Sequence, residues 1–410
     1  MYKFSHHFNK VIYLISFFTL LIGFYLSEDG TGNGLSQDFY STWRFVESLK
    51  LNFFSDPSEI TLHFPLHYFL LSLLSYVIED LEYLRFFFMI ISSFVPYLFY
   101  KALKIKFYNA NDKILILIAC TVFFIPAFRY SAIWANDHIT SLIFFLSSLV
   151  FYLKWETRKK DNNFNINIFC QILFMALAAY SRQYYAIFFL FLFAKYYEYL
   201  NFRNFLICLF ISIFLSLPGF YYLSMFPRLF TELKISSNFS VSILANSSML
   251  AVYIFPILFM NFLKKDFFLS NNKKFLIIIF LLSILITFLL SINFVPSSIY
   301  GYGIIYMLSN LLFNNNLIFL LSSVVSLFFI FFTSKESKYN ILISIILIFG
   351  FSGSILFQKY FEPMFLIIFF LIFSSSLVKI FINSLKNSYL LLCYYIIYTF
   401  IAVSDLIYKI

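Results

Sequence analysis

Long runs of apolar residues, separated by short polar segments, make up almost the whole chain. A helix needs about 17–25 such residues to cross a bilayer. We expect membrane spans at residues 9–27, 85–103, 113–131, 137–154, 166–181, 183–200, 204–223, 247–263, 275–294, 316–333, 340–357, 362–379 and 388–407. The runs at 166–181 and 183–200 could instead form one broken span. The pattern predicts an all-α polytopic membrane protein with about 11–13 transmembrane helices, in a single domain over residues 1–410.

One long polar segment, residues 28–84, follows the first apolar run. After a Gly-rich beginning, apolar residues recur at helical spacing from Asp38 onward, at Phe39, Trp43, Val46 and Leu49. A Pro-containing turn then leads to a second apolar helix, which Pro65 opens. This helix is short for a span, so we expect it to lie at the membrane interface.

Composition agrees with the pattern, since 62% of the residues are hydrophobic and only 12% are charged. The net charge of +10 does not indicate a nucleic-acid partner, because the Lys and Arg residues form short clusters between apolar runs. By the positive-inside rule these clusters are cytoplasmic, which puts the acidic segment 28–84 on the outer side. The first run is too long for a secretory signal, so we expect it to be retained as a span. The four cysteines lie within apolar runs and are expected to be small core residues.

The membrane that holds the chain follows only from residue usage. The abundance of Phe, Ile, Asn and Lys is typical of an AT-rich genome and favours a bacterial inner membrane. In a eukaryotic host the corresponding membrane would be the endoplasmic reticulum. The outer polar residues would then face the periplasm or the lumen.

Two outer carboxylates are candidates for catalysis. Asp38 lies a few residues beyond the first span, and Asp137 opens a later span. Each could simply cap or stabilise a helix N-terminus. Alternatively, Asp38 could act as a general base that takes a proton from an attacking hydroxyl, and Asp137 could line the same outer cavity. The sequence leaves both interpretations open.

Cations on the outer side are candidates for binding phosphate. Arg182, followed by Gln183, is flanked by apolar segments, and Lys359 and Tyr360 lie at an outer break between spans. Arg129 ends the span that precedes Asp137. A guanidinium near the interface suits a lipid phosphate. A lysine there could instead extend its charged end to the interface.

Five polar residues are expected to contact an acceptor or a loop, namely His63, Asp56, His138, Gln183 and Tyr360. His63 and His67 flank Pro65, but no metal-binding spacing is present, so they are better explained as interfacial polar residues. We expect no resident metal or other cofactor, with a divalent ion left open as an alternative.

Together, outer carboxylates and outer cations suit one class of reaction. A sugar carried on a polyprenyl phosphate would be the donor, and its lipid would lie in the bilayer. Cations would stabilise the phosphate that leaves, while a carboxylate deprotonates the incoming hydroxyl. Because nothing indicates a covalent intermediate, the anomeric configuration would invert.

The order of these motifs resembles that of the GT-C glycosyltransferases, multi-span enzymes that use lipid-phosphate sugars. Asp38 and Asp137 match the two acidic positions of that pattern, and "HFPLHYFLLSLL" is similar to the segment that opens an interfacial helix in its mannosyl and aminoarabinose branches. Within this superfamily the chain is most similar to the α-1,2-glucosyltransferases that act on dolichol-linked oligosaccharide. The motifs that carry this likeness are "DPSEIT", Ser181-Arg182-Gln183, Asn136-Asp137 and the segment 359–363.

The resemblance implies a division of the chain into a first span (1–27), an outer catalytic loop (28–84), GT-C helices (85–223) and C-terminal helices on the donor-lipid side (224–410). It implies a hexosyltransferase whose acceptor is a lipid-linked or cell-surface glycan. The chain departs from the family at Phe39, where a second acidic residue is expected, and at Lys359, where arginine is expected. The departure at Phe39 leaves the role of that second carboxylate either unfilled or taken by another residue, such as Asp56 or Glu59.

Two alternatives remain from other classes. A polysaccharide flippase or other transporter would place ionisable residues near the middle of several spans, whereas here they gather at outer ends. An O-antigen polymerase or ligase has a similar number of spans, but its large outer loop usually comes late in the chain.

Overall fold

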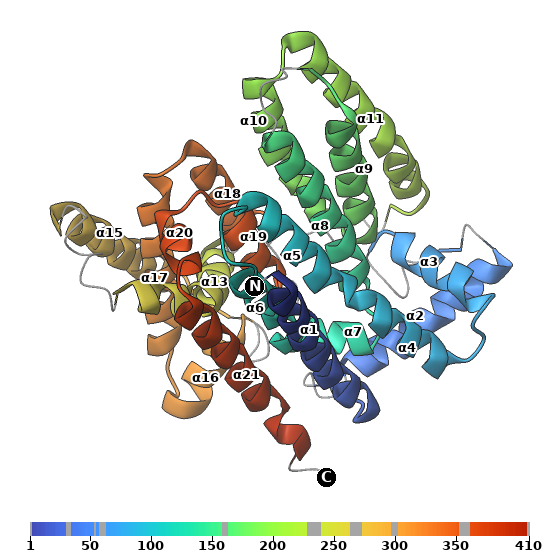
Figure 1. The fold of residues 1–410 in the computed structure, drawn as a ribbon, viewed down its shortest axis with the longest axis horizontal. Helices are drawn as coiled ribbons and strands as arrows, with labels where there is room; N and C mark the ends of the chain where they lie inside the picture. Colours follow the sequence, from blue (N-terminus) through green and yellow to red (C-terminus); the bar gives the residue numbers. More distant parts are fainter. Residues whose placement is uncertain are drawn as a thin grey trace. The chain divides into compact units, whose positions relative to one another are not determined.

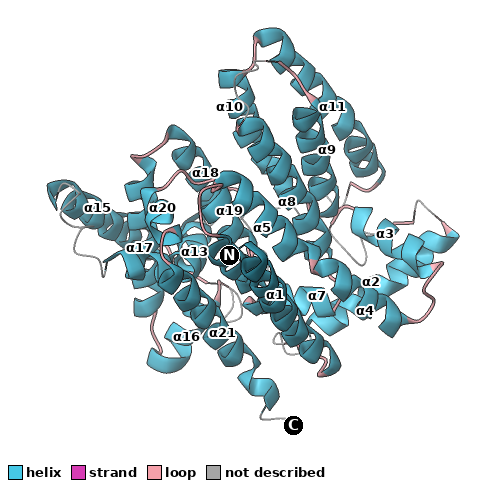
Figure 2. Ribbon diagram, viewed as in Figure 1, coloured by secondary structure: helices cyan, strands magenta, loops and turns pink. Residues whose placement is uncertain are grey.

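Helices form every regular element of the computed structural model within the residues that it describes, which are 2–29, 34–52, 55–56, 63–157, 163–227, 239–262, 273–296, 302–351 and 361–407 (Figure 2). Eight helices are long and apolar enough to cross a membrane, and two bent helix pairs raise this number to as many as ten. The chain therefore has the helices of a multi-pass membrane protein. The prediction of an all-α polytopic fold is confirmed.

The count of eight to ten is lower than the expected 11–13 because three predicted spans correspond to short helices. At 166–181 lies α9 (Ile166–Ser181), at 183–200 lies α10 (Phe189–Tyr199) after a 3-10 turn, and at 340–357 the described helix is α18 (Lys338–Phe349). The predicted spans at 113–131 and 362–379 are bent by 65° and 96°. Hydrophobicity thus located the helices but not their breaks.

The chain divides into two compact units, which we describe separately (Figure 1). Unit 1 comprises Met1–Leu233 and Tyr395–Ile410. Its helices are α1 (Tyr2–Tyr25), α2 (Gly34–Leu51), α3 (Leu66–Ser75), α4 (Leu81–Ser92), α5 (Phe94–Lys106), α6 (Asp112–Cys120), η1 (Thr121–Phe124), α7 (Pro126–Ile133), α8 (Asp137–Glu156), α9, η2 (Gln183–Phe188), α10, α11 (Phe202–Met225) and the end of α21 (Leu385–Ile407).

Unit 2 comprises Lys234–Tyr394. Its helices are α13 (Phe239–Phe262), α15 (Lys273–Ile292), α16 (Ile304–Phe313), α17 (Leu317–Ser334), α18, α19 (Met364–Leu371), α20 (Ser376–Ile382) and the start of α21. Helix α13 contacts α15 to α20 and so forms the centre of the unit. Asn246 of α13 donates to the carbonyl oxygens of Ile348 and Phe351, both at 2.8 Å, which satisfies backbone groups where α18 ends.

Several helices of unit 1 begin at a side chain that accepts backbone N–H bonds, as expected where a polar residue ends a loop. Asn136 caps α8, Asn165 caps α9 and Asn201 caps α11. Helices α8 and α9 pack along their lengths, with α10 and α11 beside them (Figure 1). Because α8 and α9 run in opposite directions, the start of α8 meets the end of α9. That meeting point brings Asp137 to Arg182.

Helix α2 begins earlier than predicted, at Gly34 rather than at Asp38. Asp38 therefore lies in the second turn of α2 and is not its cap. Asp29 takes the capping role instead, since its Oδ2 accepts a 3.0 Å bond from the backbone N–H of Ser36. The interpretation of Asp38 as a helix cap is wrong, because residues 34–37 before it already belong to the helix.

Candidate functional site

A buried ion pair joins Asp137 to Arg182. The Nη2 of Arg182 donates to Oδ1 of Asp137 at 2.5 Å, and Arg182 and Asp137 are only 3% and 2% exposed. Arg182 has extended backbone (φ −145°, ψ 111°) between α9 and η2, so the helix break presents its side chain to the start of α8. The other carboxylate oxygen of Asp137, Oδ2, is buried and has no hydrogen-bond partner among the described residues. A buried acceptor of this kind is costly unless a ligand or water satisfies it.

His67 supports the turn that precedes Asp137. Its Nε2 donates to the carbonyl oxygen of Ala135 at 3.0 Å, and its Nδ1 therefore accepts from Thr140 Oγ1 at 2.8 Å. Ala135 has a positive φ of 44°, a strained conformation that the surrounding bonds hold in place. Burial lowers the pKa of His67 to about 4, so the ring is neutral at ordinary pH.

Two further histidines lie around the ion pair. His63 Nδ1 lies 3.3 Å from Gln183 Oε1, and His138 Nδ1 lies 3.2 Å from the hydroxyl of Tyr184. His63, His67 and His138 are all electrostatic neighbours of Asp137. The structure thus brings four residues together around one carboxylate, namely Arg182, His63, His67 and His138. Arg182, His63 and His138 are among the site candidates from the sequence.

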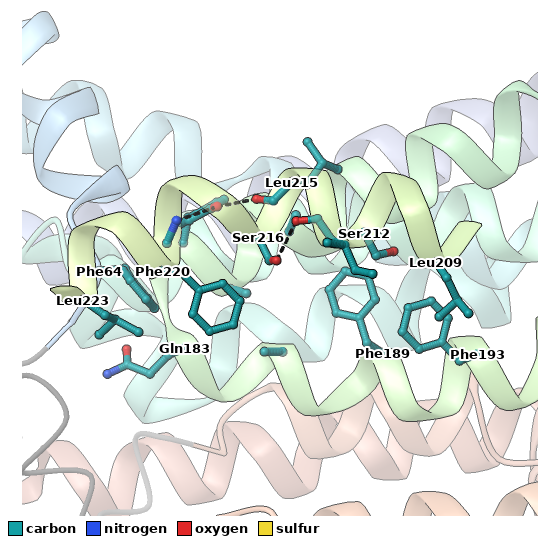
Figure 3. Close-up of a pocket in the computed structure, with 16 residues that line it drawn as sticks. Phe64, Gln183, Phe189, Phe193, Leu209, Ser212, Leu215, Ser216, Phe220 and Leu223 are labelled. Atoms are coloured by element: carbon teal, nitrogen blue, oxygen red, sulfur yellow. Dashed lines mark hydrogen bonds between the residues drawn. The ribbon is translucent and has the colours of Figure 1, made fainter. Parts of the chain in front are cut away.

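An apolar groove of about 380 Å³ begins at this cluster, lined by residues of α9, η2, α10 and α11. Figure 3 shows Gln183, Phe64 and Leu223 at one end and Phe193 and Leu209 at the other. Gln183 follows Arg182 directly and is bonded to His63. Gln183 is thus a polar residue of the groove's lining and directly follows the arginine of the Asp137–Arg182 pair.

Arg129 lies in a second buried ion pair, with Glu28. Its Nε and Nη2 donate to the two carboxylate oxygens at 2.8 and 2.6 Å. Nη1 donates to Thr19 Oγ1 and to the carbonyl oxygen of Phe123, and Nη2 also donates to the carbonyl oxygen of Thr19. These bonds use all five N–H donors of an arginine. Arg129 has no donor left for a phosphate, so we exclude it from the site.

The other residues predicted for the site belong to other segments of the chain. Asp38 is exposed on α2, and Asp56 is exposed and is an electrostatic neighbour of Tyr222. Lys359 and Tyr360 lie outside the described residues. Glu362, just after them, is buried in unit 2 and accepts a hydrogen bond from Tyr253.

Sequence reasoning missed the pairing of Glu28 with Arg129 and the roles of Asp29 and His67. A weak signal existed for Glu28 and Asp29, because two acidic residues directly follow the first span and are costly to bury there. His67 had no such signal, since its partners Ala135 and Thr140 lie far away in the sequence. No group of three or more His, Cys, Asp or Glu residues suited to a metal is present within the described part of the chain.

No family model, curated protein or solved structure matches the chain. The site must therefore be interpreted from its own geometry.

Proposed function

We propose that the protein is an inverting glycosyltransferase, which moves a hexose from a polyprenyl-phosphate donor to a lipid-linked or cell-surface glycan on the outer face of the membrane. The observation that carries this proposal is an apolar groove lined in part by Gln183, the residue that directly follows the arginine of a buried arginine–aspartate pair. A donor of this class has the same two parts, a long apolar chain and a charged phosphate. The geometry fits one ligand that uses both.

The groove suits the lipid chain because its walls are aliphatic and aromatic. Ligand sites of this kind are largely apolar with a few polar groups that fix orientation. The phosphate would lie at Arg182 and Gln183, where the planar and permanently charged guanidinium stabilises the negative charge that grows as the donor bond breaks. Asp137 holds that guanidinium, and its Oδ2 can accept a hydrogen bond from a hydroxyl of the bound sugar or acceptor.

The reaction needs a base as well as a cation. The acceptor hydroxyl attacks the anomeric carbon, the bond from that carbon to the phosphate oxygen breaks, and the hydroxyl proton passes to a carboxylate. Asp38 is our candidate for this carboxylate, because it is exposed and lies on a helix that follows the first span. A carboxylate in this role takes the proton from the hydroxyl as it attacks.

The proposal is tested with purified full-length protein in detergent, given radiolabelled polyprenyl-phosphate glucose or mannose and candidate lipid-linked acceptors. Asp38→Asn should lower transfer by about 10²–10⁴-fold, the usual contribution of a general base, without changing donor binding. Glu47→Gln is the matched control, since Glu47 is an exposed carboxylate on the same helix. Equal rates for Asp38→Asn and Glu47→Gln would remove Asp38 from the mechanism, and absence of transfer from any donor by the wild type would refute the proposed function.

A further inference from the structure

Arg85 of α4 is a buried cation that the proposed mechanism does not use. Its side chain is only 2% exposed, although Arg85 lies near the start of α4, which begins within the polar segment 28–84. Its Nη1 donates to both carboxylate oxygens of Glu82, at 2.7 and 2.9 Å, and its Nε donates to the carbonyl oxygen of Ile133 at 3.2 Å. Arg85 thereby joins α4 to the end of α7.

Three aromatic rings surround the guanidinium of Arg85. Its Cζ lies 3.6 Å from the ring centre of Trp134, 5.2 Å from that of Phe24 and 5.7 Å from that of Phe39. A cation over aromatic faces is attracted by their quadrupoles, and more strongly when water is excluded. The rings come from three segments, namely the end of α1, the helix α2 and the turn before α8, which meet near α4 and α7 (Figure 1).

Two of these rings lie next to the candidate carboxylates in sequence. Phe39 directly follows Asp38, and Trp134 begins the turn that leads to Asp137. Trp134 is held in turn, because its indole nitrogen donates to the carbonyl oxygen of Glu28 at 3.1 Å. Phe39 and Tyr40 also contact the ring of Trp134 directly, each with ring centres 6.3 Å apart. Displacing Arg85 should therefore loosen α2 at the turn and change the separation of Asp38 from Asp137.

From this arrangement we infer that Arg85 is a positioning residue, which sets the geometry of Asp38 relative to Asp137 without touching the substrate. The inference rests on the proposed function for its catalytic meaning. A misplacement of about 1 Å can cost on the order of a hundredfold in rate. The effect should fall on kcat, because the donor groove is formed by helices other than α2 and α4.

The kinetic test compares Arg85→Met, Arg85→Lys and Arg44→Met. Arg85→Met should lower kcat about a hundredfold with the KM for donor unchanged, and Arg85→Lys should recover part of the loss because a lysine keeps the charge over the rings. Arg44 is exposed on α2, so Arg44→Met is the matched control and should behave as wild type. The inference would be overturned if Arg85→Met left kcat unchanged, or if its KM for donor rose by the same factor as its kcat fell.

Hydrogen exchange tests the same inference without any transfer assay. Arg85→Met should speed amide exchange in α2 while leaving exchange in α8 and α9 as in the wild type. Phe39→Leu, which removes one ring but keeps every hydrogen bond of Arg85, should also speed exchange in α2 and covers the case in which Arg85→Met does not fold. If wild type transfers no sugar but α2 is released in these variants, the positioning role stands and the proposed function fails. Unchanged exchange in α2, or faster exchange throughout unit 1, would refute the positioning role.

Discussion

Unit 1 contains two buried arginine–carboxylate pairs that differ in how completely they are satisfied. In Glu28–Arg129 both carboxylate oxygens and all five N–H donors take part in bonds within the protein. In Asp137–Arg182 one carboxylate oxygen is bonded to the arginine and the other is buried with no hydrogen-bond partner among the described residues. Burial is nearly the same in the two pairs, so burial alone does not distinguish a structural pair from a functional one.

The residues that surround the two pairs also differ. The Glu28–Arg129 pair fastens the end of α1 to α7 and η1, and the indole nitrogen of Trp134 donates to the backbone carbonyl oxygen of Glu28. The Asp137–Arg182 pair lies among three histidines, and Gln183, the residue after Arg182, lines an apolar groove. In the Glu28–Arg129 pair every hydrogen-bonding group is already used within the protein, so none remains for a ligand. In the Asp137–Arg182 pair the Oδ2 of Asp137 remains as an acceptor. We therefore propose that the first pair stabilises the fold and that the second takes part in ligand recognition.

The largest effect on stability should come from breaking the saturated pair. Arg129→Met leaves the Glu28 carboxylate buried without its partner, which costs about 3–5 kcal/mol. The loss should appear as a lower thermal midpoint of the purified protein in detergent, with the exposed Arg44→Met as control. A thermal midpoint equal to that of the control would contradict the structural role of this pair.

Gly23 offers a second way to break the same pair. A Cβ at this position would lie 2.8 Å from Nη2 of Arg129 and closer still to Oε2 of Glu28. Gly23→Ala should therefore lower the thermal midpoint in the same direction as Arg129→Met, because the side-chain ends that it would clash with are buried and hydrogen-bonded to each other. If Gly23→Ala is as stable as wild type, the pair is less tightly confined than the contacts indicate.

The two regions should also differ in their dependence on pH, because His67 supports the turn before Asp137. Burial lowers the pKa of His67 from its ordinary value of 6.5 to about 4. Between pH 4 and pH 6.5 the unfolded chain therefore binds more protons than the folded chain. The stabilisation from neutral His67 is then complete above pH 6.5 and is lost as pH falls towards 4. The loss should amount to about 3 kcal/mol. His67→Gln should flatten the dependence of thermal midpoint on pH in this window, while His7→Gln, at an exposed position, should not.

A smaller effect is expected from filling the groove. Ser216 lines it on α11, and Ser224 lies exposed on the same helix without lining it. Ser216→Trp should weaken donor binding because the larger side chain overpacks the groove. The expected cost is about 1–3 kcal/mol, which is on the order of tenfold or more in Kd. Ser224→Trp should bind donor as wild type does. Equal affinity of the two variants for a long-chain donor would show that the lipid lies elsewhere.

The sequence predicted the positions of the helices well because hydrophobicity is a local property of each segment. Every expected span coincides with a described helix, although those at 166–181, 183–200 and 340–357 are short. Bends and breaks depend on packing between helices, so the apolar run 362–379 did not predict the 96° bend between α19 and α20. The start of α2 was missed because glycines before Asp38 indicated a loop.

The candidate site could be predicted only in part. The sequence singled out Asp137 and Arg182 as costly residues at the outer ends of spans, and the structure brings them into contact. It could not show that Arg129 pairs with Glu28, since 101 positions separate them. For the same reason nothing in the sequence distinguishes Arg85 at the start of the apolar run 85–103, because its role depends on rings from three distant segments.

The difference between the two pairs is tested most directly by measuring transfer per folded molecule for Asp137→Asn and Glu28→Gln. Folded protein is isolated by size exclusion for each variant, and the rate is divided by its concentration. We predict that folded Glu28→Gln transfers sugar at the wild-type rate, although less of it folds, while folded Asp137→Asn loses at least about a hundredfold in rate. A folded Asp137→Asn protein with the wild-type rate would contradict the assignment of this pair to the substrate.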